Sequence, residues 1–163
     1  MNRNFLLCLG ALTALVLTGC SNKCSIDADK AAPVQQANVA GSAEDFKANA
    51  HTKIYFAFNK SNLSEKGKEN AKTQAAWLKA YPNTTATVEG HTDERGTAEY
   101  NMALGAARAE STKAELVREG VAENRLTTIS YGKDRPAAYV NPADPVAADA
   151  AHAKNRRTET VLN

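Results

Sequence analysis

The stretch VEGHTDERGTAEYNMALGAARA, Val88–Ala109, contains the transition that decides the fold. It begins at the end of a strand predicted over residues 84–89 (TTATVE), whose β-branched residues favour extended backbone. A polar loop follows, and Thr97 can then cap a helix over about residues 98–119 that ends before Gly120. The stretch therefore predicts a strand-loop-helix unit with charged side chains gathered just past the end of the strand.

The segments on either side of this unit show related patterns. β-branched and aromatic residues predict three further strands, at residues 52–58 (TKIYFAF), 126–131 (LTTISY) and 157–162 (RTETVL). Ser64 can cap a helix that runs toward Tyr81. Its apolar residues recur at helical spacing, at Ala71, Ala75 and Leu78. The fold therefore alternates strands with helices as far as the third strand.

The last two strands are separated differently. A long loop that contains Pro136, Pro142 and Pro145 comes first, and a short alanine-rich segment follows. The order strand, helix, strand, helix, strand, loop, strand predicts an α+β domain in which the helices pack on one side of a single sheet. We expect this domain to cover residues 51–163.

The helix that follows the polar loop carries an arginine where burial is expected. Asn101, Leu104 and Arg108 share one face of it. Its core stripe is expected to be Leu104, Ala107, Ser111, Ala114 and Val117, with Arg108 beside it or within it. A buried guanidinium needs a partner, and its planar fork suits a carboxylate.

Asp93 lies just past the end of a strand, where ligands gather in such folds. Together with Arg108 it could frame a small pocket with opposite charges. Such a pocket would suit a zwitterion, with its ammonium near Asp93 and its carboxylate on Arg108. The residues alone leave a second interpretation open, in which the two side chains simply pair with each other in a protein-interaction module.

Neither a metal site nor catalysis is predicted. His91, Asp93 and Glu94 offer nitrogen and oxygen ligands, but no second histidine stands nearby and the spaced His and Cys set of a zinc site is missing from the sequence. The sequence also lacks a G-x-S-x-G motif, and the two adjacent acids point apart. We therefore expect no catalytic residue, no cofactor and no enzyme activity.

The charges give no reason to expect a nucleic-acid partner. The sequence has 20 basic and 18 acidic side chains, so without Arg3 the charges nearly balance, at 19 against 18. The one basic cluster, Lys154–Arg157 (KNRR), is short and lacks interleaved aromatic residues. We expect it to be solvated at the start of the last strand, with contact to a phosphate or a sugar as the alternative.

The N-terminus predicts export and lipidation. A short positive start precedes the apolar run FLLCLGALTALVL at residues 5–17, which matches a secretory signal and is too short for a membrane span. Leu17–Cys20 (LTGC) resembles the bacterial lipobox, so we expect residues 1–19 to be a lipoprotein signal peptide and Cys20 to carry the lipid anchor. Because Ser21 follows rather than an aspartate, we expect the outer membrane.

The region between the anchor and the domain is polar and alanine-rich. Residues 20–50 contain few large apolar side chains, so we expect a lipidated, flexible tether. Within it, Cys24 has no partner in the chain once Cys8 is removed with the signal and Cys20 is lipidated. An internal disulfide is therefore not expected.

Three motifs together resemble a known family. Val88–Ala109, Ser130–Ala137 (SYGKDRPA) and Ala153–Arg157 (AKNRR) occur in the order typical of the OmpA-like C-terminal domain family, and the TDERGT form resembles its lipoprotein subgroup. The likeness covers about residues 53–162. It implies a βαβαββ two-layer sandwich, with the helices packed on one face of a mixed sheet.

The resemblance also implies a function. Domains of this family bind peptidoglycan without cleaving it, by holding the diaminopimelate of the stem peptide. It implies that Asp93 and Arg108 hold the charged groups of the ligand. The other pocket residues that it implies are Thr92, Asn101, Leu104, Phe58 and Asn59. The partners that it implies are peptidoglycan, the outer membrane through the lipid, and the propeller protein of the Tol system in the periplasm.

Two departures from the family pattern bear on the ligand. The family usually has acids flanking the aromatic residue of the first strand, whereas Ala57 and Asn59 flank Phe58 here. Affinity or selectivity is expected to differ if an acid at position 59 helps to hold the ligand. The loop at residues 139–151 is also longer than usual, which would alter a partner surface.

Overall fold

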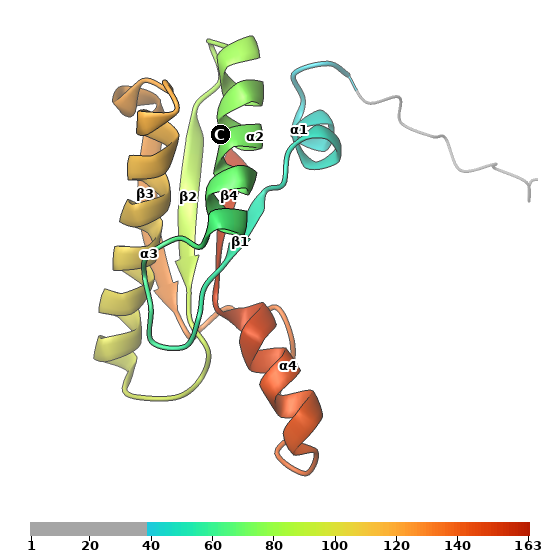
Figure 1. Cartoon of the computed structure of the whole chain (residues 1–163), viewed down its shortest axis with the longest axis vertical. Coiled ribbons are helices and arrows are strands. Elements are labelled where there is room, and N and C mark those ends of the chain that lie inside the picture. The colour runs from blue at the N-terminus through green and yellow to red at the C-terminus, as the bar shows by residue number, and fades with distance from the viewer. Residues whose placement is uncertain (1–38) are drawn as a thin grey trace, which may run out of the picture. The chain divides into compact units, whose positions relative to one another are not determined.

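A four-stranded sheet is the centre of the computed structural model, which describes residues 39–163 (Figure 1). Its strands are β1 (Lys53–Tyr55), β2 (Ala86–His91), β3 (Leu126–Gly132) and β4 (Arg157–Leu162), in the order β1-β4-β2-β3. β2 and β3 are parallel, and β4 is antiparallel to both of its neighbours. The sheet is therefore mixed. The expected signal peptide, Cys20, Cys24 and the tether as far as residue 38 lie outside the described residues.

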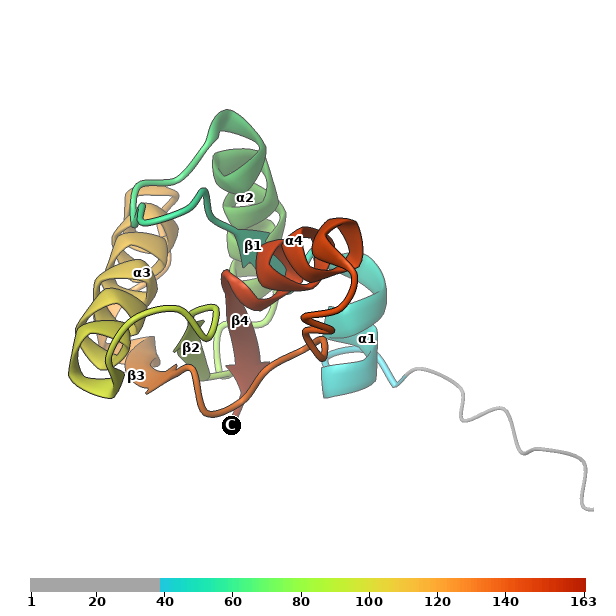
Figure 2. The same cartoon turned by 90° about the horizontal axis from the view of Figure 1, so that it is seen from below.

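Two long helices form the second layer. The helices of the described region are α1 (Ala43–Asn49), α2 (Glu65–Ala80), α3 (Ala98–Arg118) and α4 (Pro145–Asn155), with a 3₁₀ turn at Glu123–Arg125. α2 and α3 lie side by side over one face of the sheet, whereas α1 and α4 lie outside this layer (Figure 2). The predicted α+β sandwich, with its main helices on one face of a mixed sheet, is confirmed.

The cap residues of the long helices are the predicted ones. The Ser64 hydroxyl accepts from the Gly67 amide at the start of α2, and the Thr97 hydroxyl accepts from the Tyr100 amide at the start of α3. These bonds satisfy amides that the first turn of a helix leaves free. The apolar stripe predicted for α2 is also buried against the sheet.

The buried face of α3 differs from the prediction. Its buried residues are Asn101, Gly105, Arg108, Ala109, Thr112 and Leu116, whereas Ala107 and Ala114 of the expected stripe are exposed. The reason is a close approach of α3 to β2. A Cβ on Gly90 would lie 2.0 Å from the Gly105 carbonyl oxygen, so only two glycines allow this contact. Because Gly105 must face the sheet, Arg108 is turned fully into the interior.

Two strands differ in extent from their predictions. β1 stops at Tyr55, so residues 56–58 are not a strand although their composition favours one. β2 begins at Ala86 and runs to His91, two residues beyond the predicted end. Both differences lie at the end of the sheet where the polar loop begins, and they leave residues 56–64 free to form a loop there.

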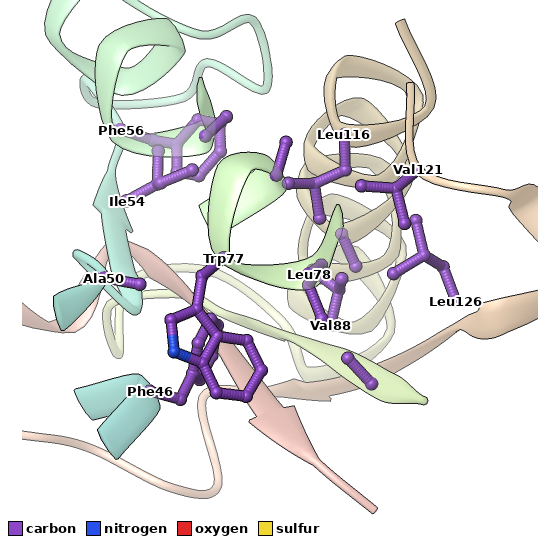
Figure 3. Packing of buried hydrophobic residues seen from close by; sticks show 14 residues of the cluster. Phe46, Ala50, Ile54, Phe56, Trp77, Leu78, Val88, Leu116, Val121 and Leu126 are labelled. Carbon is purple, nitrogen blue, oxygen red and sulfur yellow. The ribbon is translucent and has the colours of Figure 1, made fainter. Parts of the chain in front are cut away.

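The folded domain also begins earlier than residue 51. α1 lies inside the predicted tether, and its Phe46 is buried against the Trp77 ring, with 4.8 Å between the ring centroids (Figure 3). The Trp77 indole also donates to the Asp45 carboxylate at 3.0 Å. A single phenylalanine supplies most of this packing. The low apolar content of the segment therefore gave no sign that it belongs to the folded domain.

The segment before β4 also forms a helix that was not predicted. α4 begins at Pro145. The side chain of the preceding residue, Asp144, caps the helix by accepting hydrogen bonds from the amides of Val146 and Ala147. Proline suits this first helical position because its missing N–H would have had no partner there. The long loop predicted at residues 139–151 is therefore partly helical, and its last residues lead directly to Arg156 and β4.

The strand directions bring several loops to one end of the sheet. β1, β2 and β3 run in the same direction and β4 runs against them. Residues 56–64, which follow β1, and residues 92–97, which follow β2, therefore meet the start of β4 (Figure 1). Within residues 39–163, none of the helices is long and apolar enough to cross a bilayer.

Candidate ligand-binding site

A pocket of about 240 Å³ lies at this end of the sheet. It is lined by all seven residues that were predicted from the sequence and the resemblance: Phe58, Asn59, Thr92, Asp93, Asn101, Leu104 and Arg108. Four further residues that were not predicted also line the pocket: Arg95, Gly96, Tyr100 and Arg156. The lining thus comes from the loop after β1, the loop after β2, the first turns of α3 and the residue before β4.

Asp93 is the one acid of the pocket lining, and it is 5% exposed. Its Oδ2 accepts from the Arg95 side chain at 2.5 and 3.2 Å and from Arg156 at 3.2 Å. Burial acts to raise the pKa of this carboxyl, but the hydrogen bonds from the two arginines outweigh burial and hold the pKa below its usual value. Asp93 is therefore ionised at neutral pH.

Arg108 is fully buried, and its charge is held by backbone oxygens. Nε donates to the Lys60 carbonyl at 2.9 Å, NH1 to the His91 carbonyl at 2.9 Å and NH2 to the Ala57 carbonyl at 3.3 Å. Burial lowers its pKa to about 10, so the guanidinium remains charged at neutral pH. Carbonyl dipoles orient the fork, but they bring no negative charge of their own.

Asp93 and Arg108 do not form an ion pair. Among residues 39–163, Arg108 has no carboxylate within 4.0 Å, and the ion pairs of Asp93 are with Arg95 and Arg156. The interpretation in which the two side chains satisfy each other is therefore wrong. The pocket instead contains a cation without a counter-ion and an anion in separate places, as a zwitterionic ligand requires.

The first turn of α3 positions the acidic side of the pocket. The Asn101 amide donates to the Arg95 carbonyl at 2.9 Å and to the Thr97 carbonyl at 3.0 Å. Gly96 has a φ of +92°, a left-handed conformation that favours glycine and turns the loop sharply. The Thr92 hydroxyl donates to the Asp93 carbonyl at 3.0 Å. The loop is thus fixed on both sides of Asp93.

Two contacts cross the rim of the pocket. The Arg95 guanidinium lies 4.2 Å from the centroid of the Phe58 ring, and the Tyr100 hydroxyl donates to the Asn59 side chain. Asn59 has a φ of +55°, which asparagine tolerates better than most residues. Arg108 lines the same pocket and is fully buried, so a covering side chain would have to move before a ligand could touch its guanidinium.

The basic cluster before β4 is not the solvated surface that was expected. Arg156 donates to the Phe56 carbonyl at 3.1 Å as well as to Asp93, and Asn155 and Arg157 are buried. Spacing along the chain could not place Arg156 beside Asp93, which lies 63 positions earlier. The AKNRR motif was the available signal, since it occurs together with the motif that contains Asp93.

His91 lies beside the pocket without contributing its side chain to it. Its ring is 2% exposed, stacks on Tyr131 with 5.5 Å between centroids, and neither ring nitrogen has a hydrogen-bond partner in the described part of the chain. Burial, with a smaller contribution from the positive Arg157, lowers its pKa to about 4. Residues 39–163 contain no group of three or more His, Cys, Asp or Glu side chains placed to hold a metal ion.

Comparison with known proteins adds independent evidence. The sequence profile described as the OmpA family matches residues 55–152. The chain is 40% identical over 156 residues to a peptidoglycan-associated lipoprotein of Rhizobium meliloti, covering 94% of this chain and 85% of that protein. It is also 40% identical to one of Brucella melitensis, covering 92% of this chain and 87% of that protein.

A solved structure shows the same likeness in three dimensions. The crystal structure of the peptidoglycan-associated lipoprotein from Burkholderia pseudomallei superposes with a TM-score of 0.62 at 34% identity, covering 69% of this chain and 90% of that one. The sequence profile, the relatives and the shared fold agree with one another. The chain therefore belongs to the OmpA family, in its group of peptidoglycan-associated lipoproteins.

Proposed function

We propose that this domain binds peptidoglycan non-covalently by holding the diaminopimelate end of a stem peptide in the pocket of Asp93 and Arg108. The observation that carries this proposal is that Arg108 is fully buried, is charged, and has only carbonyl oxygens as hydrogen-bond partners within residues 39–163. A buried cation in this state is stabilised by an incoming carboxylate.

The free end of diaminopimelate has the matching chemistry. It carries an ammonium and a carboxylate on one carbon, and the pocket offers an ionised Asp93 for the first and Arg108 for the second. The pocket volume of about 240 Å³ suits the end of one side chain rather than a long glycan. As the resemblance to the OmpA-like family implies, the ligand would be bound and not cleaved.

The anchor completes the proposed function. A lipid on Cys20 would hold the chain in the outer membrane, and the residues between Cys20 and α1 would let the domain reach the wall in the periplasm. Binding at the pocket would then tie that membrane to the wall. Following its family, the chain would act in the Tol-Pal system with the periplasmic propeller protein as partner, and so take part in envelope constriction at division.

Co-sedimentation with purified sacculi tests the binding step. The chain from Ala37 onward, which forms the compact unit, would be compared with Asp93→Asn and with the control Asp134→Asn, whose side chain is exposed and outside the pocket. The wild type and the control should sediment and free diaminopimelate should release them, whereas Asp93→Asn should stay in solution. Equal sedimentation of all three folded proteins would contradict the proposal.

A further inference from the structure

The Asp93 carboxylate is already occupied by two cations, and they are held differently. Arg156 has only 15% of its side chain exposed, and it is fixed by a second bond to the Phe56 carbonyl. Arg95 has 41% of its side chain exposed, and its only side-chain hydrogen bonds among the described residues go to Asp93. Arg95 is therefore the partner that an incoming ammonium can replace, while Arg156 remains.

Arg95 has a second contact that would keep it at the rim after such a replacement. Its guanidinium lies over the Phe58 ring at 4.2 Å, and Phe58 is 58% exposed. This cation–π contact does not depend on Asp93. The neighbouring Gly96, with its φ of +92°, lets the backbone turn so that the side chain projects over the pocket.

The charges of the pocket do not balance. One carboxylate, Asp93, faces the three guanidinium groups of Arg95, Arg108 and Arg156. A bound zwitterion would supply one ammonium and one carboxylate, and so would leave the excess of positive charge unchanged. Once Asp93 has taken the ligand's ammonium, Arg95 has no carboxylate within 4.0 Å in the described region. A second carboxylate on the ligand would reduce this excess from two positive charges to one, and would give Arg95 a new partner.

We propose that Arg95 determines ligand specificity by exchange: it occupies Asp93 in the free protein, gives way to the ligand's ammonium, and then binds a second carboxylate on the residue next to the diaminopimelate. This inference rests on the proposed function. It predicts that the site selects anionic stem peptides with a free carboxylate at that residue over peptides in which the same group is a carboxamide. Arg95 thus opposes the free zwitterion and favours the larger anionic peptide.

Calorimetric titration of the compact unit with three ligands tests the exchange. The ligands are free diaminopimelate, a stem-peptide fragment with the neighbouring carboxylate, and the same fragment with a carboxamide. The wild type should bind the carboxylate fragment about three- to tenfold more tightly than the carboxamide. In Arg95→Gln this ratio should fall to about one, while free diaminopimelate should bind about two- to fivefold more tightly because its competitor is gone.

Two further variants complete the test. Arg118→Gln removes the same charge from an exposed arginine at the far end of α3, and it should behave as the wild type. Arg95→Lys keeps the charge and should retain part of the carboxylate preference. A preference that Arg95→Gln leaves unchanged would overturn the proposal, as would weaker binding of free diaminopimelate by that variant.

The result for the wild type separates the two proposals. If the wild type binds diaminopimelate but does not distinguish the carboxylate from the carboxamide fragment, the exchange is wrong and the proposed function stands. If the folded wild type binds none of the three ligands, the proposed function fails and the exchange fails with it.

Discussion

Asp93 and Arg108 line one pocket without pairing with each other. The carboxylate is held by Arg95 and Arg156, and the guanidinium by the carbonyls of Lys60, His91 and Ala57. Two opposite charges in one pocket usually form an ion pair, whereas here each side chain is held by other groups. This separation leaves both charges available to the zwitterionic ligand that we propose, and the next prediction depends on it.

The chemistry of the ligand's end should decide affinity. A stem peptide that carries lysine in place of diaminopimelate keeps the ammonium and lacks the carboxylate for Arg108. Losing one charge-assisted hydrogen-bonded contact costs about 1.5–3 kcal/mol, which is about ten- to a hundredfold in affinity. Competition of both peptides for sacculus binding measures the difference, and equal competition would contradict the assignment of Arg108 to a carboxylate.

Arg108→Lys should destabilise the domain. Lysine keeps the charge, but its single nitrogen cannot reach the three carbonyls that the guanidinium fork spans. Leaving buried acceptors unsatisfied should lower the free energy of unfolding by about 2–3 kcal/mol. Urea denaturation measures this change. Arg118→Lys, at an exposed site, is the matched control and should change it little.

His91 should make stability depend on pH between about 4 and 6.5. Its pKa is lowered to about 4 in the folded protein, so the unfolded chain binds the proton more readily. Its contribution is complete above pH 6.5 and is lost as pH falls toward 4, with a total of about 3 kcal/mol. Since carboxyl groups also titrate in this range, the difference between wild type and His91→Phe isolates the effect.

The phenylalanine variant is a fair comparison because neither nitrogen of His91 has a hydrogen-bond partner among the described residues. His91→Phe should therefore unfold with a weaker pH dependence than the wild type. Parallel stability curves for the two proteins from pH 4 to 7 would show that His91 is protonated in the fold at its ordinary pKa.

The close approach of α3 to β2 should not tolerate a methyl group. In Gly90→Ala the new Cβ would lie 2.0 Å from the Gly105 carbonyl oxygen, so the helix must move away from the sheet. We expect a loss of at least about 3 kcal/mol in the free energy of unfolding. Gly67→Ala is the control, because its Cβ would meet side-chain atoms rather than backbone, with Ile54 nearest at 3.1 Å, in a helix that favours alanine. Thermal unfolding of both variants should separate them clearly.

α1 should contribute to stability although it lies in the expected tether. Phe46→Ala removes a buried ring that packs on Trp77, and it should cost about 3–4 kcal/mol. A chain that begins at His51 should be destabilised to a similar degree relative to one that begins at Ala37. If both chains denature at the same urea concentration, α1 is not part of the cooperative unit.

The elements with strong local signals could be predicted from the sequence. Ser64 and Thr97 cap their helices as expected, and Gly120 follows the end of α3 with a φ of +97°. The buried face of α3 could not be predicted in the same way. It is set by the contact of Gly105 with Gly90, and apolar periodicity does not report a contact made by two residues without side chains.

The residues of the pocket could also be predicted only in part. Asp93 and Arg108 were predicted to frame a pocket because their types and positions suggested charge at the end of a strand and in a helix core, and both line the pocket. Arg95 and Arg156 were missed, since an arginine in a loop or in a basic cluster is usually solvated. Their roles come from the fold, which brings the start of β4 next to the loop after β2.

A crystal structure of the compact unit with a diaminopimelate stem peptide tests the central claim most directly. The account predicts that the ligand's carboxylate accepts hydrogen bonds from Arg108, and that its ammonium lies on Asp93, with Arg156 still bound there. Ligand density at another surface, with the Asp93 and Arg108 pocket unoccupied, would contradict it.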